Sequence, residues 1–225
     1  GNPAITAAAA LAAAEGAATR PAPPLPTDAI EGSASPADTR QESGGDQFAT
    51  LASLAHVARH IAQRAPQSGG YRSLFAAESD PARYAAEVAR LAELLGETGN
   101  KVLLIDWSPA ASGVAKALGI AAAPGISELM CDRAAFEDII QRMPGSDVHA
   151  IAGGNAFAEA IAAGSGPDTD RLNLILDALD EAYDHIVVAG AKSEARELFQ
   201  AIQGRFDAGI LFAGSGLRQP SPDAA

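Results

Sequence analysis

The stretch Val102-Leu103-Leu104-Ile105-Asp106 is the clearest strand in the sequence. Its four apolar residues follow one another with no polar residue between them, which is typical of a strand buried on both faces. Further short apolar runs lie at residues 73–77, 148–152, 185–189 and 208–213. Helical patterns separate these runs, so we expect βαβ units. The fold class is α/β, a three-layer sandwich around a mainly parallel central sheet of about five strands.

Helical periodicity predicts the elements between the strands. Pro81 is expected to open a helix, because its missing N–H costs little in the first turn, and Gly99 is expected to follow its end. The other predicted helices cover Phe48–Ala62, Val114–Leu118, residues 125–130, Phe136–Arg142, Asp170–Tyr183 and Glu194–Ile202.

Composition divides the chain near residue 46. Six of the fourteen prolines lie in the first 45 residues, where large apolar residues are nearly absent. Residues 1–45 are therefore expected to be a disordered Ala/Pro-rich tether, and the abrupt start at Gly1 suggests a piece of something longer. Residues 46–214 are expected to form one domain with its N-terminal helix within 46–65. Residues 215–225 are polar and are expected to be a flexible tail.

Charge and cysteine content exclude several classes of protein. The chain has 16 Lys+Arg against 28 Asp+Glu, a net charge of −12, which argues against nucleic acid or an anionic membrane surface as a partner. The single cysteine, Cys131, excludes an internal disulfide framework and a cysteine-based zinc site. His56 and His60 lie four residues apart, but no third ligand follows at a suitable spacing, so no metal site is predicted. No apolar run is long enough to span a bilayer.

Seven motifs follow one another along the expected domain: Lys101-Val102-Leu103-Leu104-Ile105-Asp106, Leu118-Gly119-Ile120, Pro124-Gly125-Ile126-Ser127-Glu128-Leu129, Phe136-Glu137-Asp138-Ile139-Ile140-Gln141, His149-Ala150-Ile151-Ala152-Gly153-Gly154, Leu176-Asp177-Ala178-Leu179 and Tyr183-Asp184-His185-Ile186-Val187-Val188. In order and spacing, over residues 71–214, they resemble the cytoplasmic domain of bacterial tyrosine kinases. Those kinases accompany polysaccharide copolymerases, the chain-length determinants of exopolysaccharide and capsule export. The resemblance implies a P-loop NTPase-like fold related to the ParA/MinD proteins and truncated at the C-terminal end.

The resemblance places the nucleotide-binding loop at residues 80–86, read back from Val102 without gaps. The family's loop presents backbone N–H groups from glycines to the phosphates, a lysine that neutralises them and a hydroxyl that holds Mg²⁺. Here bulkier residues occupy the glycine positions, a tyrosine stands for the lysine, and alanines, which offer no metal ligand, stand for the hydroxyl. In chain order the degenerate loop is Pro81, Ala82, Arg83, Tyr84, Ala85 and Ala86.

The acidic motifs that the resemblance implies are also incomplete. Asp106 keeps the first carboxylate of an Asp-x-Asp pair, but Ser108 replaces the second, and Ala189 stands where a later strand normally ends in Asp. We interpret Asp106 as a helix or turn cap rather than a metal ligand. Tyr84 is expected to pack into the vacated nucleotide pocket, the alternative being an ordinary exposed helix tyrosine. Arg83 is interpreted as part of a solvated helix face.

Three further interpretations concern side chains outside these motifs. His149 and His185 stand at strand starts and are expected to satisfy local hydrogen bonds. Cys131 is interpreted as a small core or loop residue. The helix Phe48–Ala62 lacks the Glu-Arg-Arg spacing through which the resembling family joins subunits into a ring. We therefore expect this helix to cap the sheet of its own domain.

The missing phosphate-handling residues predict a pseudo-kinase, with no catalytic residue, metal or cofactor of its own. The expected function is that of the cytoplasmic domain of an exopolysaccharide biosynthesis or export protein. It would lie at the inner membrane, anchored by segments upstream of residue 1, and act as a docking or regulatory module in chain-length control. Expected partners are other polysaccharide synthesis or export proteins, or further copies of the chain. Two alternatives remain: an ATPase or tyrosine kinase completed by a partner, and a soluble ParA/MinD-like positioning protein.

Overall fold

The computed structural model describes residues 54–64, 69–78, 81–108, 114–156, 168–202 and 204–212. The expected tether and tail, and the first residues of the helix Phe48–Ala62, lie outside these ranges. Within them, no helix is both long enough and apolar enough to cross a membrane.

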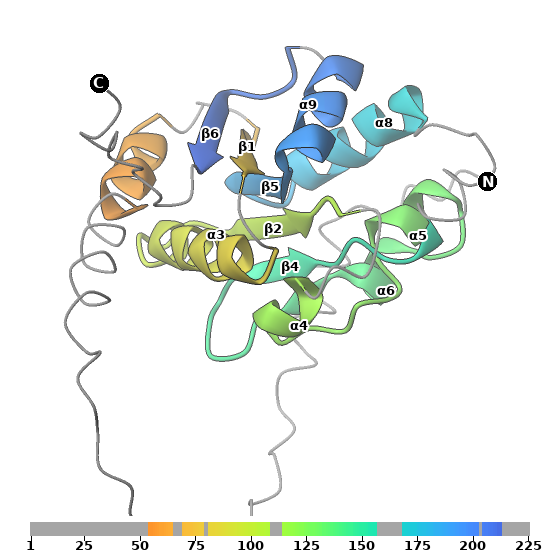
Figure 1. The fold of residues 1–225 in the computed structure, drawn as a ribbon, viewed down its shortest axis with the longest axis horizontal. Coiled ribbons are helices and arrows are strands. Elements are labelled where there is room, and N and C mark those ends of the chain that lie inside the picture. The colour runs from red at the N-terminus through yellow and green to blue at the C-terminus, as the bar shows by residue number, and fades with distance from the viewer. Residues whose placement is uncertain are drawn as a thin grey trace, which may run out of the picture.

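A six-stranded sheet forms the middle layer (Figure 1). Its order is β3-β4-β2-β5-β1-β6, and every neighbouring pair is parallel except β3 with β4. All five expected strands are present. The strands are β1 (Tyr71–Ala77), β2 (Val102–Asp106), β3 (Gln141–Arg142), β4 (His149–Ile151), β5 (His185–Ala191) and β6 (Ala208–Phe212).

Two helical layers cover the sheet, which explains why its central strands lack polar alternation. A helix at residues 54–62, α3 (Pro81–Gly96) and α4 (Val114–Leu118) share a core with Leu104 and Val187. On the opposite face, the core around Leu103 and Val188 is shared by α5 (Ile126–Met130), α6 (Phe136–Ile139), α8 (Thr169–Asp180) and α9 (Lys192–Ala201). Successive residues of one strand thus point into different cores.

The prediction of one helix over Phe136–Arg142 is wrong. Helix α6 ends at Ile139, and Gln141–Arg142 form the short strand β3, antiparallel to β4. The side-chain amide of Gln141 exchanges two hydrogen bonds with the backbone of Ala121, at 2.7 and 2.9 Å. The backbone N–H of Met143 donates to Val148 O at 2.9 Å and closes the hairpin. The contact with Ala121, 20 residues earlier, and the hairpin together override the local helical preference.

The two strand-start histidines differ in their surroundings. His149 Nδ1 lies 3.0 Å from the hydroxyl of Tyr183, so its expected hydrogen bond is confirmed. The expectation is wrong for His185, which is fully buried and has no hydrogen-bond partner for either ring nitrogen within the described ranges. Its ring meets that of Tyr71 edge-on, with centroids 6.0 Å apart. Burial lowers the pKa of His185, so the neutral imidazole is the form that the core holds.

A buried arginine links the sheet to the layer of α8. Arg72 on β1 is 5% exposed and donates from Nε to Asp180 and from Nη2 to Asp177, each at 2.9 Å. Its backbone N–H donates to Asp207, just before β6, at 2.8 Å. Arg205 also pairs with Asp177. This network fixes the start of β1 against the end of α8, and nothing in the local sequence pattern indicated it.

Replacing the buried cation should cost far more stability than replacing an exposed one. We expect Arg72→Met to lower the free energy of unfolding by about 2 kcal/mol, because the buried guanidinium loses its charged hydrogen bonds to Asp177 and Asp180, whose side chains stay partly exposed. The measurement is denaturant unfolding at neutral pH. Arg90→Met is the matched control, since Arg90 pairs with Glu93 and Glu97 on the solvated side of α3. Its cost should stay below about 0.5 kcal/mol. Equal losses in the two variants would contradict this account.

Candidate functional site

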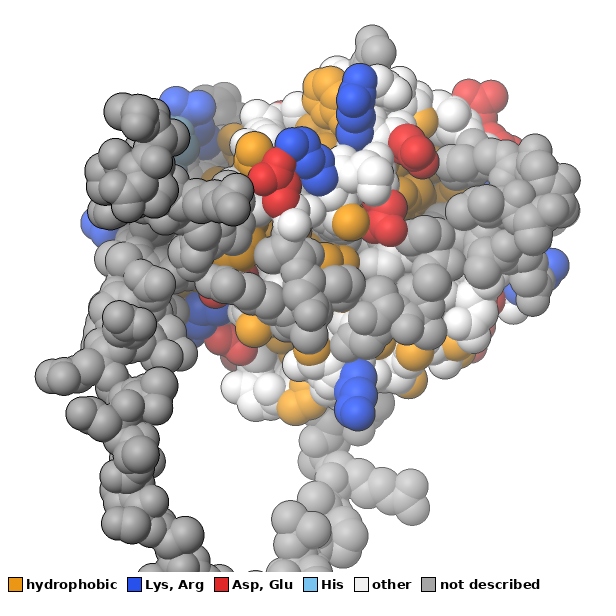
Figure 2. All heavy atoms as spheres, viewed as in Figure 1, with side chains coloured by type: hydrophobic (Ala, Val, Ile, Leu, Met, Phe, Trp, Pro, Cys, Tyr) orange, Lys and Arg blue, Asp and Glu red, His pale blue; other side chains and the backbone are white. Residues whose placement is uncertain are grey.

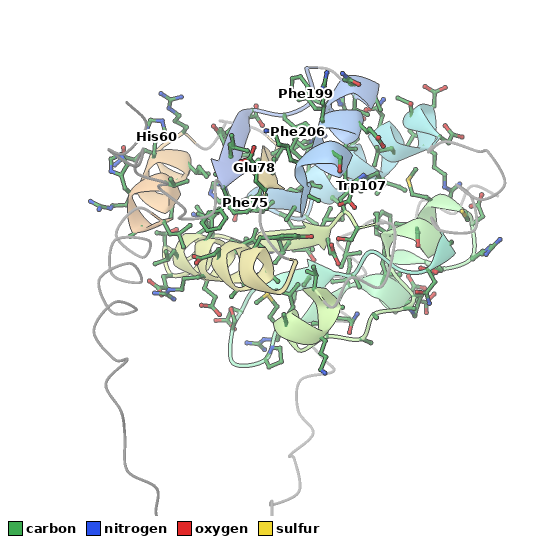
Figure 3. The ribbon with its side chains drawn as sticks, in the orientation of Figure 1. His60, Phe75, Glu78, Trp107, Phe199 and Phe206 are labelled. Carbon is green, nitrogen blue, oxygen red and sulfur yellow. The ribbon has the colours of Figure 1, made fainter. Side chains whose placement is uncertain are left out.

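The carboxyl ends of β1, β2 and β5 meet at one edge of the sheet, the edge where ligands bind in parallel α/β folds. Residues 106–108 leave β2 there, and the first turns of α3 and α9 begin there. Figure 3 labels Trp107 and Glu78, which follow β2 and β1. We call this edge, with the residues that follow the three strands, the carboxyl edge.

Tyr84 lies in the first turns of α3 and is 1% exposed, so the alternative of an exposed helix tyrosine is wrong. Its ring belongs to the core that contains Phe75, Ala85 and Ala189. Its hydroxyl oxygen lies 3.1 Å from Ser108 Oγ. The helix therefore starts with an aromatic ring turned inward.

Ser108 continues this chain of contacts to Asp106. Its Oγ donates to Asp106 Oδ1 at 2.6 Å, and both residues are buried. Because the serine has one proton and gives it to the carboxylate, the Tyr84 hydroxyl must be the donor in its contact with Ser108. The three side chains form one hydrogen-bonded series from α3 to β2, which we call the Tyr84–Ser108–Asp106 chain.

The charge on Asp106 is disfavoured by its surroundings. Burial raises the pKa of Asp106 to about 6, and the nearby carboxylate of Glu194 adds to the shift. Hydrogen bonds from Ser108 and from the backbone of Gly153 act in the opposite direction. Burial likewise raises the pKa of Tyr84 to about 12, so its hydroxyl stays protonated at neutral pH.

Glu194, in the first turn of α9, is a member of this site that the sequence prediction missed. Its Oε2 accepts a hydrogen bond from the backbone N–H of Ala191 at 2.9 Å, and burial raises its pKa. A glutamate three residues after the start of a helix is a capping signal that the sequence does contain. Its approach to Asp106 depends on the packing of α9 and could not be read from that signal.

Loops at the carboxyl edge pack backbone against backbone. A Cβ placed on Gly153 would lie 2.4 Å from Ser108 O, and one on Gly190 would lie 3.2 Å from Trp107 O. The backbone N–H of Trp107 donates to Ala189 O at 2.7 Å, which extends the pairing of β2 and β5. Side chains larger than hydrogen are therefore excluded at Gly153 unless these loops separate.

The structure brings some of the predicted site residues together and leaves others apart. Tyr84, Ser108 and Asp106 are in contact, and Ala189 is paired in register with Asp106. Ala85 is buried, whereas Ala86 is exposed. The backbone of Pro81, Ala82 and Arg83 belongs to α3, and the side chains of these three residues lie outside the described part of the structure.

Cationic side chains at this edge are already partnered where the structure describes them. Lys192, the first residue of α9, forms an ion pair with Glu78, which follows β1, and both are exposed. Among the described residues, no group of three or more His, Cys, Asp or Glu side chains is placed to hold a metal ion. On the face drawn in Figure 2, acidic and basic side chains lie interspersed. Cys131, at the end of α5, is a free, exposed cysteine.

Neither a family model nor a curated protein matches the sequence. Solved structures do match. The chimerical protein CapA2B2 superposes with a TM-score of 0.59 at 16% identity, over 74% of this chain and 72% of that one. The kinase domain of the Escherichia coli tyrosine kinase ETK gives 0.56 at 14% identity, over 76% and 79%. The VpsO kinase domain gives 0.55 at 20% identity, over 75% and 83%.

The chain has the fold of bacterial tyrosine kinase domains. The expected fold class, a P-loop NTPase-like α/β sandwich with a mainly parallel sheet, is therefore confirmed, with six strands in the described ranges instead of about five. The fold likeness extends over about three quarters of the chain.

The raised pKa of Asp106 predicts how stability depends on pH. Its pKa in the unfolded chain is near 3.8 and in the fold about 6, so the native state favours the protonated acid. The stability that this residue contributes is fully present below pH 4 and is lost as the pH rises through 6, a difference of about 3 kcal/mol. We expect Asp106→Asn to remove this pH dependence, measured by urea unfolding between pH 4 and 7.

The control for this experiment is Glu181→Gln, which changes the charge of an exposed residue just after α8. Its pH profile should follow that of the unmodified chain. An Asp106→Asn profile that is as steep as that of the unmodified chain would contradict the assignment.

Proposed function

We propose that the chain is a non-catalytic, kinase-like domain of an exopolysaccharide biosynthesis or export protein. In this proposal it acts as a docking or regulatory module in the control of polysaccharide chain length. One observation carries the loss of catalysis: the Tyr84–Ser108–Asp106 chain occupies the place where α3 begins beside the end of β2.

The start of α3 supports this proposal by its geometry. If residues 80–86 correspond to the phosphate-binding loop of the resembling family, that loop has become the first turns of a helix that starts at Pro81. Proline has no N–H to offer a phosphate, and residues 81–86 contain no glycine that would let the backbone approach one. Tyr84, which would replace the lysine, is neutral and already bonded to Ser108.

The balance of charge points the same way. The retained carboxylate, Asp106, is buried, and its Oδ1 already accepts a hydrogen bond from Ser108, so this oxygen is less available as a ligand for Mg²⁺. Lys192, the described cation at this edge, is paired with Glu78. Losing one contact to developing phosphate charge costs about 3 kcal/mol in enzymes, so several losses together would remove the chemical step.

The tyrosines argue against the alternative in which a partner completes an autophosphorylating kinase. The chain has three tyrosines, and all are buried: Tyr71 is 6% exposed, Tyr84 1% and Tyr183 3%. A hydroxyl must leave the core before it can reach the active site of a kinase. None of the three is therefore a phosphate acceptor while the domain is folded.

The wider assignments belong to the same proposal. The folded domain would cover residues 46–214 and lie at the cytoplasmic face of the inner membrane, held there by segments that precede residue 1. Its partners would be other polysaccharide synthesis or export proteins. A gene with two membrane-spanning segments upstream of this sequence would support this arrangement, and a start codon near residue 46 would contradict it.

Nucleotide binding is the direct test. We expect isothermal titration of the chain with ATP and Mg²⁺ to show no binding at millimolar nucleotide, because α3 begins at a proline, residues 81–86 contain no glycine, and a neutral tyrosine stands in place of the expected lysine. A kinase domain of the same fold that keeps the glycine and lysine residues serves as the positive control. Micromolar binding of ATP by this chain would contradict the proposal.

Phosphorylation by an added kinase tests the burial of the tyrosines. We expect an active tyrosine kinase and ATP to leave Tyr71, Tyr84 and Tyr183 unmodified in the folded chain, as read by mass spectrometry of peptides. The positive control is the same chain, unfolded in urea, cut by a protease into short fragments and then diluted into the assay. These fragments should accept phosphate. Stoichiometric modification of a folded, uncut chain would show that one of these side chains is accessible.

A further inference from the structure

The outer edge of β6 is an unpaired strand edge in the described part of the chain. β6 is the last strand of the sheet and pairs with β1 alone. Gly209 and Leu211 are exposed, and Leu211 keeps 58% of its surface accessible. Such an edge presents backbone N–H and C=O groups that another extended chain can pair with.

A hollow lies between this strand and the helix at residues 54–62, which stands beside β6 in Figure 1. Its volume is about 520 Å³. Val57 and Ile61 from the helix form its apolar wall, and Gly209 and Leu211 line it from β6. A Cβ added at Gly209 would meet no atom within 4 Å, so the hollow is open on that side.

Basic side chains follow the same hollow. His56, His60 and Arg64 lie four residues apart along the helix and the turn after it, so they share one side, and all three line the hollow. Figure 3 labels His60 on this helix. None of the three forms a side-chain hydrogen bond or ion pair with any residue in the described ranges. We call this set the basic stripe.

The acidic residue of the hollow does not neutralise the stripe. Asp207 accepts a hydrogen bond from the backbone N–H of Arg72 at 2.8 Å, which holds its carboxylate against β1. The chain as a whole has a net charge of −12, so a basic group that pairs with no residue of the described ranges is a local exception. Charge complementarity therefore favours an acidic occupant.

We propose that β6 and the basic stripe together bind an extended, acidic peptide segment of a partner protein. The segment would lie alongside β6 as an added strand, with its backbone paired to the strand edge. Ala208 and Ile210 of β6 pack on the side of the helix, so Leu211 points to the other face and meets the hollow only at the strand edge. Because side chains alternate along a strand, one set in the peptide would place carboxylates on the side of the helix and the stripe, and the other would place apolar groups beside Leu211. The inference stands apart from the nucleotide site, since the hollow is lined by Tyr71 and Asp207 at the starts of β1 and β6, and none of its lining residues belongs to the Tyr84–Ser108–Asp106 chain.

A second copy of the chain is a poorer occupant. A two-fold axis through paired β6 edges, perpendicular to the sheet, would place both helices of residues 54–62 on the same face of the joint sheet. The two Arg64 cations would then lie on the same face of the joint sheet, and neither copy would offer an acidic strand to them. A single acidic strand offers the complementary charge.

The probe is a short fluorescein-labelled peptide in which glutamate alternates with valine, added to the full chain and followed by anisotropy. We expect saturable binding, and a loss of at least about tenfold in affinity for the double variant His60→Glu, Arg64→Glu. Arg59→Glu is the matched control: Arg59 is on the same helix and exposed, but it does not line the hollow and its Nε donates to Ala55 O. That variant should bind as the unmodified chain does.

Two altered peptides separate the parts of the proposal. N-methylation of every second peptide residue removes half of the backbone donors. Methylation of the set whose N–H groups pair with β6 should abolish binding, and methylation of the other set should not. Replacing glutamate by lysine should abolish binding altogether. Circular dichroism of each variant establishes that it is folded.

Three outcomes would overturn the proposal: no binding of the glutamate peptide, equal binding of the lysine peptide, or an equal loss in Arg59→Glu. Self-association of the chain by sedimentation, lost in the double variant and without peptide binding, would assign the edge to a second copy instead.

Discussion

The pairing of β5 with both of its neighbours is the constraint on which the rest of the fold depends. β5 is in register with β1 from Tyr71↔His185 to Ala77↔Ala191, and with β2 from Val102↔His185 to Asp106↔Ala189. Its residues are buried on both faces up to Gly190. A slip by one residue would exchange the two sets of core side chains, so the register is strongly fixed. That register brings the carboxyl ends of β1, β2 and β5, with the residues that follow them, together at the carboxyl edge.

At that edge the fold holds a buried acid, Asp106, that forms no ion pair with any cation in the described ranges. Asp106 is tolerated because Ser108 and the backbone of Gly153 donate to it, and because its proton affinity rises. Tyr84 completes the arrangement, because its hydroxyl, on α3, donates a hydrogen bond to Ser108 Oγ. These three residues stabilise the junction of α3 with β2. In the proposed function, nucleotide chemistry has been lost at this same junction.

Apolar runs were enough to predict the five parallel strands. The central strands are covered on both faces and therefore carry their signal in consecutive residues, and β6 shows an apolar run although Gly209 and Leu211 are exposed. β3 escaped prediction because two polar residues, Gln141 and Arg142, have no period of their own, and the contact with Ala121 decides their conformation. Tyr84 was correctly expected to be buried. Glu194, the Arg72 network and the unsatisfied ring of His185 depend on packing between segments far apart in the chain, which local patterns do not contain.

The tight contact of Gly153 with Ser108 has a consequence for the history of the molecule. If the carboxyl edge descends from a nucleotide-binding ancestor, a back-mutation of Tyr84 to lysine would not restore it. The new ammonium group would enter a dry core beside a serine that is pressed against a neighbouring backbone, and the helix would still begin at a proline. A return to such a site would therefore need changes at Pro81 and Ser108 as well as at Tyr84.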